Sequence, residues 1–438
     1  MSSTTILAGM FISLVALMLT SAPLAFVLGA IAFLTTVSVW EPSALIVGTL
    51  NTFKTMKSEA LMAIPLYVLM ASILQKAGII EALYMAMEKW FGRLSGGLAI
   101  GTIVICTIMA AMTGIVGAAV AAMGILALPS MLERKYNVEL SVGTICAGGT
   151  LGILIPPSVV TIVYAITAQI SIGKMFIACI VPGIILATTY CIYIVIRVSL
   201  NPDLAPKPET VGDVDLAEKL QSLTALALPF FVIFSVLGSI YMGLATPTEA
   251  AAVGVFGTFL SAMFMGKLRP ELVSAACGDT LRVTAMIMWI TIGAKAFISA
   301  FNATGAPDSM LLYIETLNAS PLVVLMVMLL ILIFLGLFLD EIGIILLCVP
   351  VFLPIVDTLG YDPLWFGVLF MITAQMAYIT PPFGYTLFYL KAVLPEGISI
   401  GRVYRGIMPF FALQLLVLVL FITLPELVTW LPNQVRGN

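Results

Sequence analysis

The sequence contains no histidine and little charge, since only 9% of its 438 residues are Asp, Glu, Lys or Arg. A soluble domain carries about 25% charged residues. The missing histidine excludes His-based zinc sites, Ser-His-Asp triads and histidine proton relays. With 61% apolar residues, the chain has too little charge to cover a soluble surface. We therefore expect a protein that crosses a lipid bilayer many times.

Other kinds of chemistry are also poorly represented. The six cysteines lie in apolar segments without a CxxC pair, which favours small buried side chains over redox or metal sites. A formal net charge of −3 predicts no nucleic-acid partner. The Gly-Lys pairs at 173–174 and 266–267 are not followed by Ser or Thr, so the phosphate-binding loop of an ATP-driven pump is missing. The sequence has no clear Ser-Lys or paired-Asp motif of the kind that would indicate an intramembrane enzyme.

Twelve apolar runs without period-2 alternation predict an all-α polytopic membrane protein rather than a β-barrel. The runs at 97–131 and 321–356 are too long for one span of about 20 residues and too short for two spans with a loop. We predict that both are re-entrant hairpins, which leaves ten crossing helices. With both termini outside, fourteen of the 19 Lys and Arg residues fall on the cytoplasmic side and four fall outside, as the positive-inside rule requires.

Motifs of the first half recur in the second half at a nearly constant offset. Ile170-Ser171-Ile172-Gly173-Lys174 returns as Ile398-Ser399-Ile400-Gly401-Arg402. Prolines recur at offsets of 224 to 227: Pro23 and Pro247, Pro129 and Pro354, Pro156-Pro157 and Pro381-Pro382, Pro182 and Pro409. About five spans and one hairpin make an odd number of crossings, so the second copy must be inverted, as in secondary transporters. We predict repeats at 1–200 and 222–438, joined by a polar, Pro-rich cytoplasmic linker at 201–221.

Each predicted repeat has two consecutive prolines inside an apolar run, at 141–168 and 364–391. Proline has no N–H and disfavours helix in the residue before it. Carbonyls ahead of the prolines therefore lose their partners, and a bound cation can satisfy them. The half-helix that follows presents free N–H groups, which favour an anion. We predict that each broken helix offers a cation site and an anion site.

Few polar side chains lie near the predicted hairpin tips and breaks. Asp340 and Glu341 are adjacent carboxylates deep in an apolar run, where acids are usually functional, although a helix cap or an ion pair is an alternative. Lys295 lies within a span and is a candidate partner for a substrate carboxylate, with snorkelling as the alternative. Four residues that follow the breaks are further candidates for substrate contact: Ser158, Thr161, Tyr385 and Thr386.

The segment Gly149-Thr150-Leu151-Gly152, followed by Ile155-Pro156-Pro157-Ser158, resembles the signature of the DctM-type large membrane subunit of tripartite ATP-independent periplasmic (TRAP) transporters. Supporting matches are Ala245-Thr246-Pro247-Thr248-Glu249 and Phe338-Leu339-Asp340-Glu341, and the resemblance covers essentially the whole chain. It implies a sodium-driven importer of the bacterial inner membrane, with a scaffold, an elevator-type transport domain and no organic cofactor. It also implies two partners: a small four-helix membrane subunit, expected as a separate chain, and a periplasmic substrate-binding protein.

Sodium sites of this family lie between a hairpin tip and the broken helix of the same repeat. Carried over by resemblance, the first site would use Thr113, Ile115, Gly152, Ile155 and Pro157. The offset of 225 residues places the second site at Phe338, Asp340, Ala377, Thr380 and Pro382. No transition metal is implied. The expected cargo is a small organic anion, either a carboxylate or a sulfonate.

Two other functions stay open. A stand-alone sodium–dicarboxylate symporter of related inverted-repeat fold would transport without a binding protein. An ion channel would conduct passively and would usually oligomerise around a pore, and it has no need of two hairpins that open to opposite sides.

Overall fold

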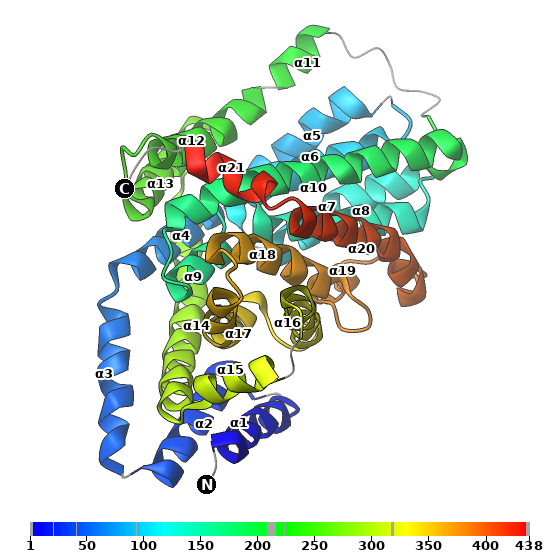
Figure 1. Ribbon diagram of the computed structural model, residues 1–438. Coiled ribbons are helices and arrows are strands. Elements are labelled where there is room, and N and C mark those ends of the chain that lie inside the picture. Colours follow the sequence, from blue (N-terminus) through cyan, green and yellow to red (C-terminus); the bar gives the residue numbers. More distant parts are fainter. Residues whose placement is uncertain are drawn as a thin grey trace.

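The computed structural model describes residues 3–20, 22–40, 42–92, 94–114, 116–207, 216–222, 224–316 and 319–434, and this part of the chain contains helices and no strand (Figure 1). The α-helices are α1 Ser3–Met18, α2 Leu24–Val39, α3 Leu45–Met56, α4 Ala63–Lys76, α5 Ile79–Phe91, α6 Gly97–Thr113, α7 Val116–Glu133, α8 Val138–Leu154, α9 Val159–Thr167, α10 Ile172–Leu200, α11 Leu216–Ser222, α12 Thr224–Tyr241, α13 Pro247–Phe264, α14 Pro270–Ala303, α15 Ala306–Thr316, α16 Pro321–Leu335, α17 Glu341–Thr358, α18 Pro363–Ile379, α19 Tyr385–Lys391, α20 Ile400–Thr423 and α21 Glu426–Gln434.

Fewer helices than predicted meet the length and apolarity of a full span. Among the described residues, seven helices qualify, or eight if α8 and α9, which meet at an angle of 41°, form one bent span. Several predicted spans are shorter apolar helices of 10 to 17 residues, such as Leu24–Val39 and Pro363–Ile379. Prolines and glycines end these helices early, so hydropathy runs overstated their helical length. The expected ten crossings are therefore not reached on this criterion.

Helix interruptions lie inside the predicted hairpin and break ranges. The chain turns between α6 and α7 at Gly114, and between α16 and α17 at 336–340. It leaves the helix between α8 and α9, and again between α18 and α19. Both Pro-Pro bonds at these breaks, Pro156-Pro157 and Pro381-Pro382, are cis. The return of each hairpin to its own side of the membrane stays a prediction.

Helix ends are also encoded at equivalent positions of the two halves. The Asn137 side chain caps α8 by accepting a hydrogen bond from the Leu140 amide. At an offset of 225, the Asp362 side chain caps α18 by accepting one from the Leu364 amide. Pro182 lies inside α10 and Pro409 lies inside α20. These correspondences agree with an internal repeat, whereas its inversion across the membrane stays a prediction.

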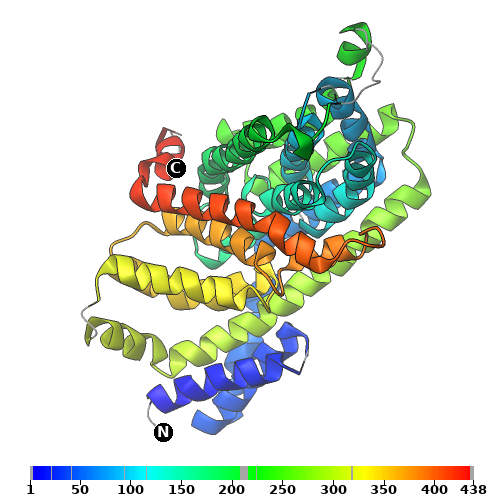
Figure 2. The ribbon, with the colours of Figure 1, turned by 90° about the vertical axis from the view of Figure 1, so that its right-hand side faces the viewer.

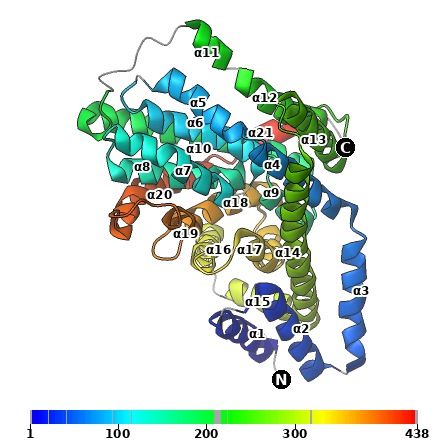
Figure 3. The ribbon, with the colours of Figure 1, turned by 180° about the vertical axis from the view of Figure 1, so that it is seen from behind.

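We call α1 to α4 and α12 to α15 the frame helices. The long helix α14 runs through this group and packs along α2, α3 and α4 (Figures 2 and 3). Gly293 permits the closest approach, because a Cβ at this position would lie 3.2 Å from the carbonyl carbon of Ala25 on α2. This contact fixes the rotation of α14 about its own axis, and with it the side chains that α14 presents to its neighbours.

We call α6 to α10 and α16 to α20 the core helices. Helix α8 packs against α6, α7, α18 and α20. Gly143 lets α20 approach α8, since a Cβ there would lie 2.8 Å from the Gly406 carbonyl carbon. At the same end, the Arg402 guanidinium donates to both Glu139 carboxylate oxygens at 2.7 and 3.0 Å. The frame helices meet the core helices where α4 contacts α6 and α9 and where α14 contacts α17.

Candidate functional site

Threonine hydroxyls replace the N–H groups that the prolines remove at the two breaks. In an unbroken helix, a backbone N–H at position 157 would donate to the Ile153 carbonyl, but proline has no N–H. Instead Ser158 and Thr161 donate to that carbonyl through their hydroxyls, at 3.1 and 3.2 Å. Both side chains are fully buried, so the first break supplies donors to this carbonyl from its own side chains.

The second break uses the same device at an offset of 225. Pro382 removes the donor for the Tyr378 carbonyl, and the Thr386 hydroxyl donates to it at 2.8 Å. Phe383 stands where the first repeat has Ser158, so the Tyr378 carbonyl has one side-chain donor among the described residues and the Ile153 carbonyl has two.

The tip of the first hairpin touches the first break directly. Gly114 ends α6 in the left-handed region, with φ of +58°. A Cβ on Gly114 would lie 3.0 Å from both the Pro157 carbonyl oxygen and the Ser158 Cα. Glycine is therefore required for conformation and for space, and the tip lies beside the carbonyls predicted for the first sodium site.

Three of these carbonyls lack a hydrogen-bond donor among the described residues. Pro156 takes the place of the N–H that would pair with the Gly152 carbonyl, and no donor reaches the carbonyls of Ile155 and Pro157. The Thr113 hydroxyl is buried and donates to the Met109 carbonyl at 2.9 Å, which leaves its lone pairs free. The fifth predicted ligand, Ile115, lies outside the described residues.

The predicted second site is already hydrogen-bonded in this conformation. The Phe338 carbonyl accepts from the Tyr385 hydroxyl at 3.2 Å, and the Ala377 carbonyl accepts from the Thr380 amide at 3.2 Å. The Thr380 carbonyl accepts from Gly384, and the Pro382 carbonyl accepts from Tyr404. A cation would have to displace these donors or bind to the same carbonyl oxygens beside them. The two predicted sites therefore differ in how many of their carbonyls already accept a hydrogen bond.

Asp340 and Glu341 lie at the start of α17, at the second hairpin tip. Asp340 is the N-cap of α17, and its Oδ1 accepts from the Gly343 amide at 3.3 Å. The Glu341 amide donates to the Tyr378 hydroxyl at 3.0 Å. Both side chains are half-buried, and none of the ion pairs found in the described ranges includes either carboxylate. Two acids without basic partners therefore stand at this tip.

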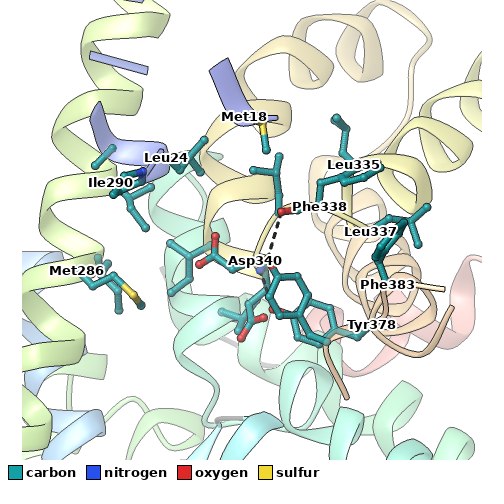
Figure 4. A pocket seen from close by; sticks show the side chains of 18 of the residues that line it. Met18, Leu24, Met286, Ile290, Leu335, Leu337, Phe338, Asp340, Tyr378 and Phe383 are labelled. Carbon is teal, nitrogen blue, oxygen red and sulfur yellow. Dashed lines mark hydrogen bonds between the residues drawn. The ribbon is translucent and has the colours of Figure 1, made fainter. Parts of the chain in front are cut away.

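A cavity of about 1070 Å³ separates the frame helices from the core helices here. Figure 4 shows Asp340 between Met286 and Ile290 of α14 on one side and Tyr378 and Phe383 on the other. The frame wall comes from α1, α2 and α14 and is apolar. The core wall contains the second tip, the start of α9 and α19, and it also includes Gly114 of the first tip. Both hairpin tips thus face one cavity.

Of the predicted substrate contacts, the structure brings only Tyr385 to this cavity. Ser158, Thr161 and Thr386 are fully buried at the breaks instead. Lys295 is half-buried on α14 but lies five residues beyond Ile290, on another side of the helix, and does not line the cavity. In this conformation, those four residues are therefore placed away from the candidate site.

Among the aromatic residues of the cavity wall, Tyr385 is a predicted substrate contact, whereas Tyr378, Tyr389 and Trp289 are not among the predicted site residues. The Tyr378 and Tyr385 rings stack with centroids 5.0 Å apart. Tyr389 lines the same wall, and its ring would be 2.8 Å from a Cβ on Gly117 of the first hairpin. The proximity of Tyr378 and Tyr385 to the second Pro-Pro pair was a usable signal. For Trp289 of the frame wall, the sequence offered none.

Comparison with known proteins identifies the family. The family model described as "Tripartite ATP-independent periplasmic transporter, DctM component" matches residues 11–427. The chain is 33% identical over 401 residues to the C4-dicarboxylate TRAP transporter large permease protein DctM of Pseudomonas aeruginosa, which covers 91% of this chain and 92% of that protein. It is 28% identical over 380 residues to the sialic acid TRAP transporter large permease protein SiaM of Vibrio cholerae, with 86% and 87% covered.

The fold is similar to that of the YdaH transporter of Alcanivorax borkumensis. The TM-score is 0.66 at 14% sequence identity, and the match covers 95% of this chain and 99% of that one. At this identity the likeness concerns the fold alone. The match of the family model to nearly the whole chain is decisive. The chain therefore belongs to the DctM family of large TRAP transporter permease subunits, and it is a multi-pass membrane transport protein rather than an enzyme.

Proposed function

We propose that this chain is the permease subunit through which a sodium-coupled TRAP importer moves a small organic anion across the bacterial inner membrane. The observation that carries the proposal is the set of carbonyls at Gly152, Ile155 and Pro157, beside the first hairpin tip, that no donor of the described residues reaches. Buried carbonyls without donors are costly in a membrane. A bound sodium ion would satisfy them with hard oxygen ligands, which suit this ion.

The second site would form around the Asp340 carboxylate. Sodium there would compete with the donors that now occupy the Phe338, Ala377, Thr380 and Pro382 carbonyls. Asp340 adds a negative charge that the first site lacks. We propose that the first site fills with little rearrangement and that filling the second site moves the second hairpin tip.

The substrate would bind in the cavity between the two tips. The nine-residue helix α9 begins at the cavity wall with Val159 and Val160. The dipole of this helix favours negative charge at its amino-terminal end. The Tyr378 hydroxyl adds a donor on the same wall, and the Tyr385 hydroxyl would add a second if sodium took its place at the Phe338 carbonyl. The two relatives are named for a C4-dicarboxylate and for sialic acid, both carboxylates, which agrees with an anionic cargo.

In the proposed cycle, the frame helices are the scaffold and the core helices move as an elevator-type transport domain. The frame wall is mainly apolar and carries no charged side chain among its described lining residues, so it offers few polar contacts that would hold the substrate back. Coupling arises if the substrate binds well only after sodium has ordered the tips. A periplasmic binding protein would deliver the substrate, and a separate small membrane subunit would complete the scaffold. Both termini would face the periplasm.

Uptake of radiolabelled C4-dicarboxylate into proteoliposomes tests the proposal, with the small subunit reconstituted and the binding protein added outside. We expect uptake only with an inward sodium gradient and with the binding protein present. Equal uptake after replacing sodium by potassium would contradict sodium coupling. Full uptake without binding protein would favour the stand-alone symporter, and passive flux along the substrate gradient alone would favour a channel.

A further inference from the structure

A second cavity, of about 400 Å³, lies where α8, α10 and α20 meet. Three arginines, Arg197, Arg402 and Arg405, and one acid, Glu139, line it. We call this cavity the arginine pocket. It shares no lining residue with the large cavity between the frame and core helices, so it is a separate site whose chemistry the transport proposal does not use.

The arginine pocket has more positive charge than its own acid can balance. Arg402 is committed to Glu139 through two hydrogen bonds of 2.7 and 3.0 Å. Arg197 and Arg405 are exposed, and neither forms an ion pair within the described ranges. Two guanidinium groups that lack an acidic partner among the described residues therefore line one cavity. Like charges that line one cavity repel each other, and a bound anion would relieve this repulsion.

Apolar surface adjoins the charged part of the arginine pocket. The rings of Tyr193 and Phe410 form its floor, in an edge-to-face contact with centroids 5.2 Å apart. On α10, Ile192, Val195 and Ile196 are each at least 50% exposed and lie within about one turn and a half of Arg197. In a multi-pass membrane protein, such exposed aliphatic side chains face lipid tails. Positive charge above an apolar strip matches the layout of a phospholipid.

We propose that the arginine pocket binds the phosphate group of an anionic phospholipid, with Arg197 and Arg405 as donors and an acyl chain along α10. Guanidinium groups suit phosphate because they donate two parallel hydrogen bonds. Basic pockets between helices at the cytoplasmic membrane surface are a recurrent site for anionic lipids, and Arg197 and Arg405 fall on that side in the predicted topology. The proposal requires only that the chain spans a membrane, not that transport is sodium-coupled.

Lipid binding to the purified full chain tests this inference. Phosphatidylglycerol is titrated into protein in an uncharged detergent, and retained lipid is measured by native mass spectrometry. Phosphatidylethanolamine serves as the lipid without net charge, and inorganic phosphate as the free anion. The test variant is Arg197→Gln with Arg405→Gln. The control is Lys267→Gln with Arg269→Gln, which removes two exposed charges outside the pocket.

We expect the test variant to bind phosphatidylglycerol roughly 10- to 30-fold more weakly, from about 1 kcal/mol for each basic residue, while the control binds as the parent does. Equal weakening in both variants would overturn the proposal by assigning binding to general surface charge, and unchanged binding in the test variant would overturn it outright. Displacement of the lipid by equimolar inorganic phosphate would assign the pocket to a free anion. Equal melting temperatures of the lipid-free proteins would show that both variants are folded.

Discussion

Gly114 lies against Pro157, at a distance of 3.0 Å between the position of a Cβ and the Pro157 carbonyl oxygen. This contact joins the first hairpin to the first broken helix at one of the unpaired carbonyls. Any side chain at 114 would push the hairpin tip away from the break, and the oxygen atoms proposed to share a sodium ion would separate.

Gly114→Ala is therefore expected to weaken sodium-dependent uptake strongly. Alanine at positive φ costs about 1 kcal/mol, and the contact with Pro157 adds to this cost. We expect the sodium concentration for half-maximal uptake to rise about tenfold or more. The control is Gly360→Ala, since Gly360 has φ of +74° and no atom within 4 Å of a Cβ. An equal effect in both variants would show that strain alone, and not the tip contact, is responsible.

Thr386→Val is expected to destabilise the protein more than Thr161→Val. Loss of Thr386 leaves the Tyr378 carbonyl buried without its side-chain donor, at a cost of about 1–3 kcal/mol. After loss of Thr161, Ser158 still donates to the Ile153 carbonyl at 3.1 Å. Thermal unfolding in detergent measures the difference, and Thr386→Ser should restore most of the stability. A larger loss in Thr161→Val would contradict the proposed substitution of hydroxyls for proline N–H groups.

Asp340→Asn separates the charge of this side chain from its capping role. Asparagine caps a helix as well as aspartate does, so the melting temperature should change little. If the carboxylate binds sodium, half-maximal uptake should need at least about ten times more sodium. Asp340→Ala removes the cap as well and should cost a further 0.5–2 kcal/mol of stability, about 1 on average. An unaltered sodium dependence in Asp340→Asn would exclude the carboxylate from the coupling site.

Cross-linking the frame to the second hairpin should stop transport. Gly343 packs directly against the Leu24 side chain of α2, so Leu24→Cys and Gly343→Cys place two thiols at this boundary. We expect the oxidised double variant to lose uptake and the reductant to restore it, which serves as its internal control. Continued uptake by a fully cross-linked sample would contradict the elevator proposal, because the two groups of helices could not have moved past each other at this contact.

Local sequence chemistry was sufficient to locate the helix breaks. Pro156-Pro157 and Pro381-Pro382 exclude continuous helix wherever they stand, so their effect does not depend on the rest of the fold. Asp340 was correctly located near a hairpin tip for a similar reason, because a carboxylate in an apolar run needs a helix end or a ligand. The capping alternative considered for it is also what the geometry shows.

Side-chain direction could not be predicted in the same way. The position of Thr161 after the break favours a substrate contact, yet its hydroxyl donates to the carbonyl of Ile153, eight residues earlier. The position of Lys295 within a span makes it a candidate partner for a substrate carboxylate, but it does not predict the direction of the side chain. Its direction depends on the rotation of α14, which the contact of Gly293 with Ala25 sets. Such contacts join segments more than 250 residues apart, and no local pattern encodes them.

The side-chain hydroxyls that donate to the Ile153 and Tyr378 carbonyls have a thermodynamic consequence for the proposed binding of sodium. A helix break without such hydroxyls would sample many backbone conformations, and an ion would have to immobilise it on arrival, at about 1–2 kcal/mol for each ordered residue. Here folding itself orders the residues around each Pro-Pro pair. The first break is thus preorganised by the fold, and a sodium ion at the proposed site would bind without that entropic cost.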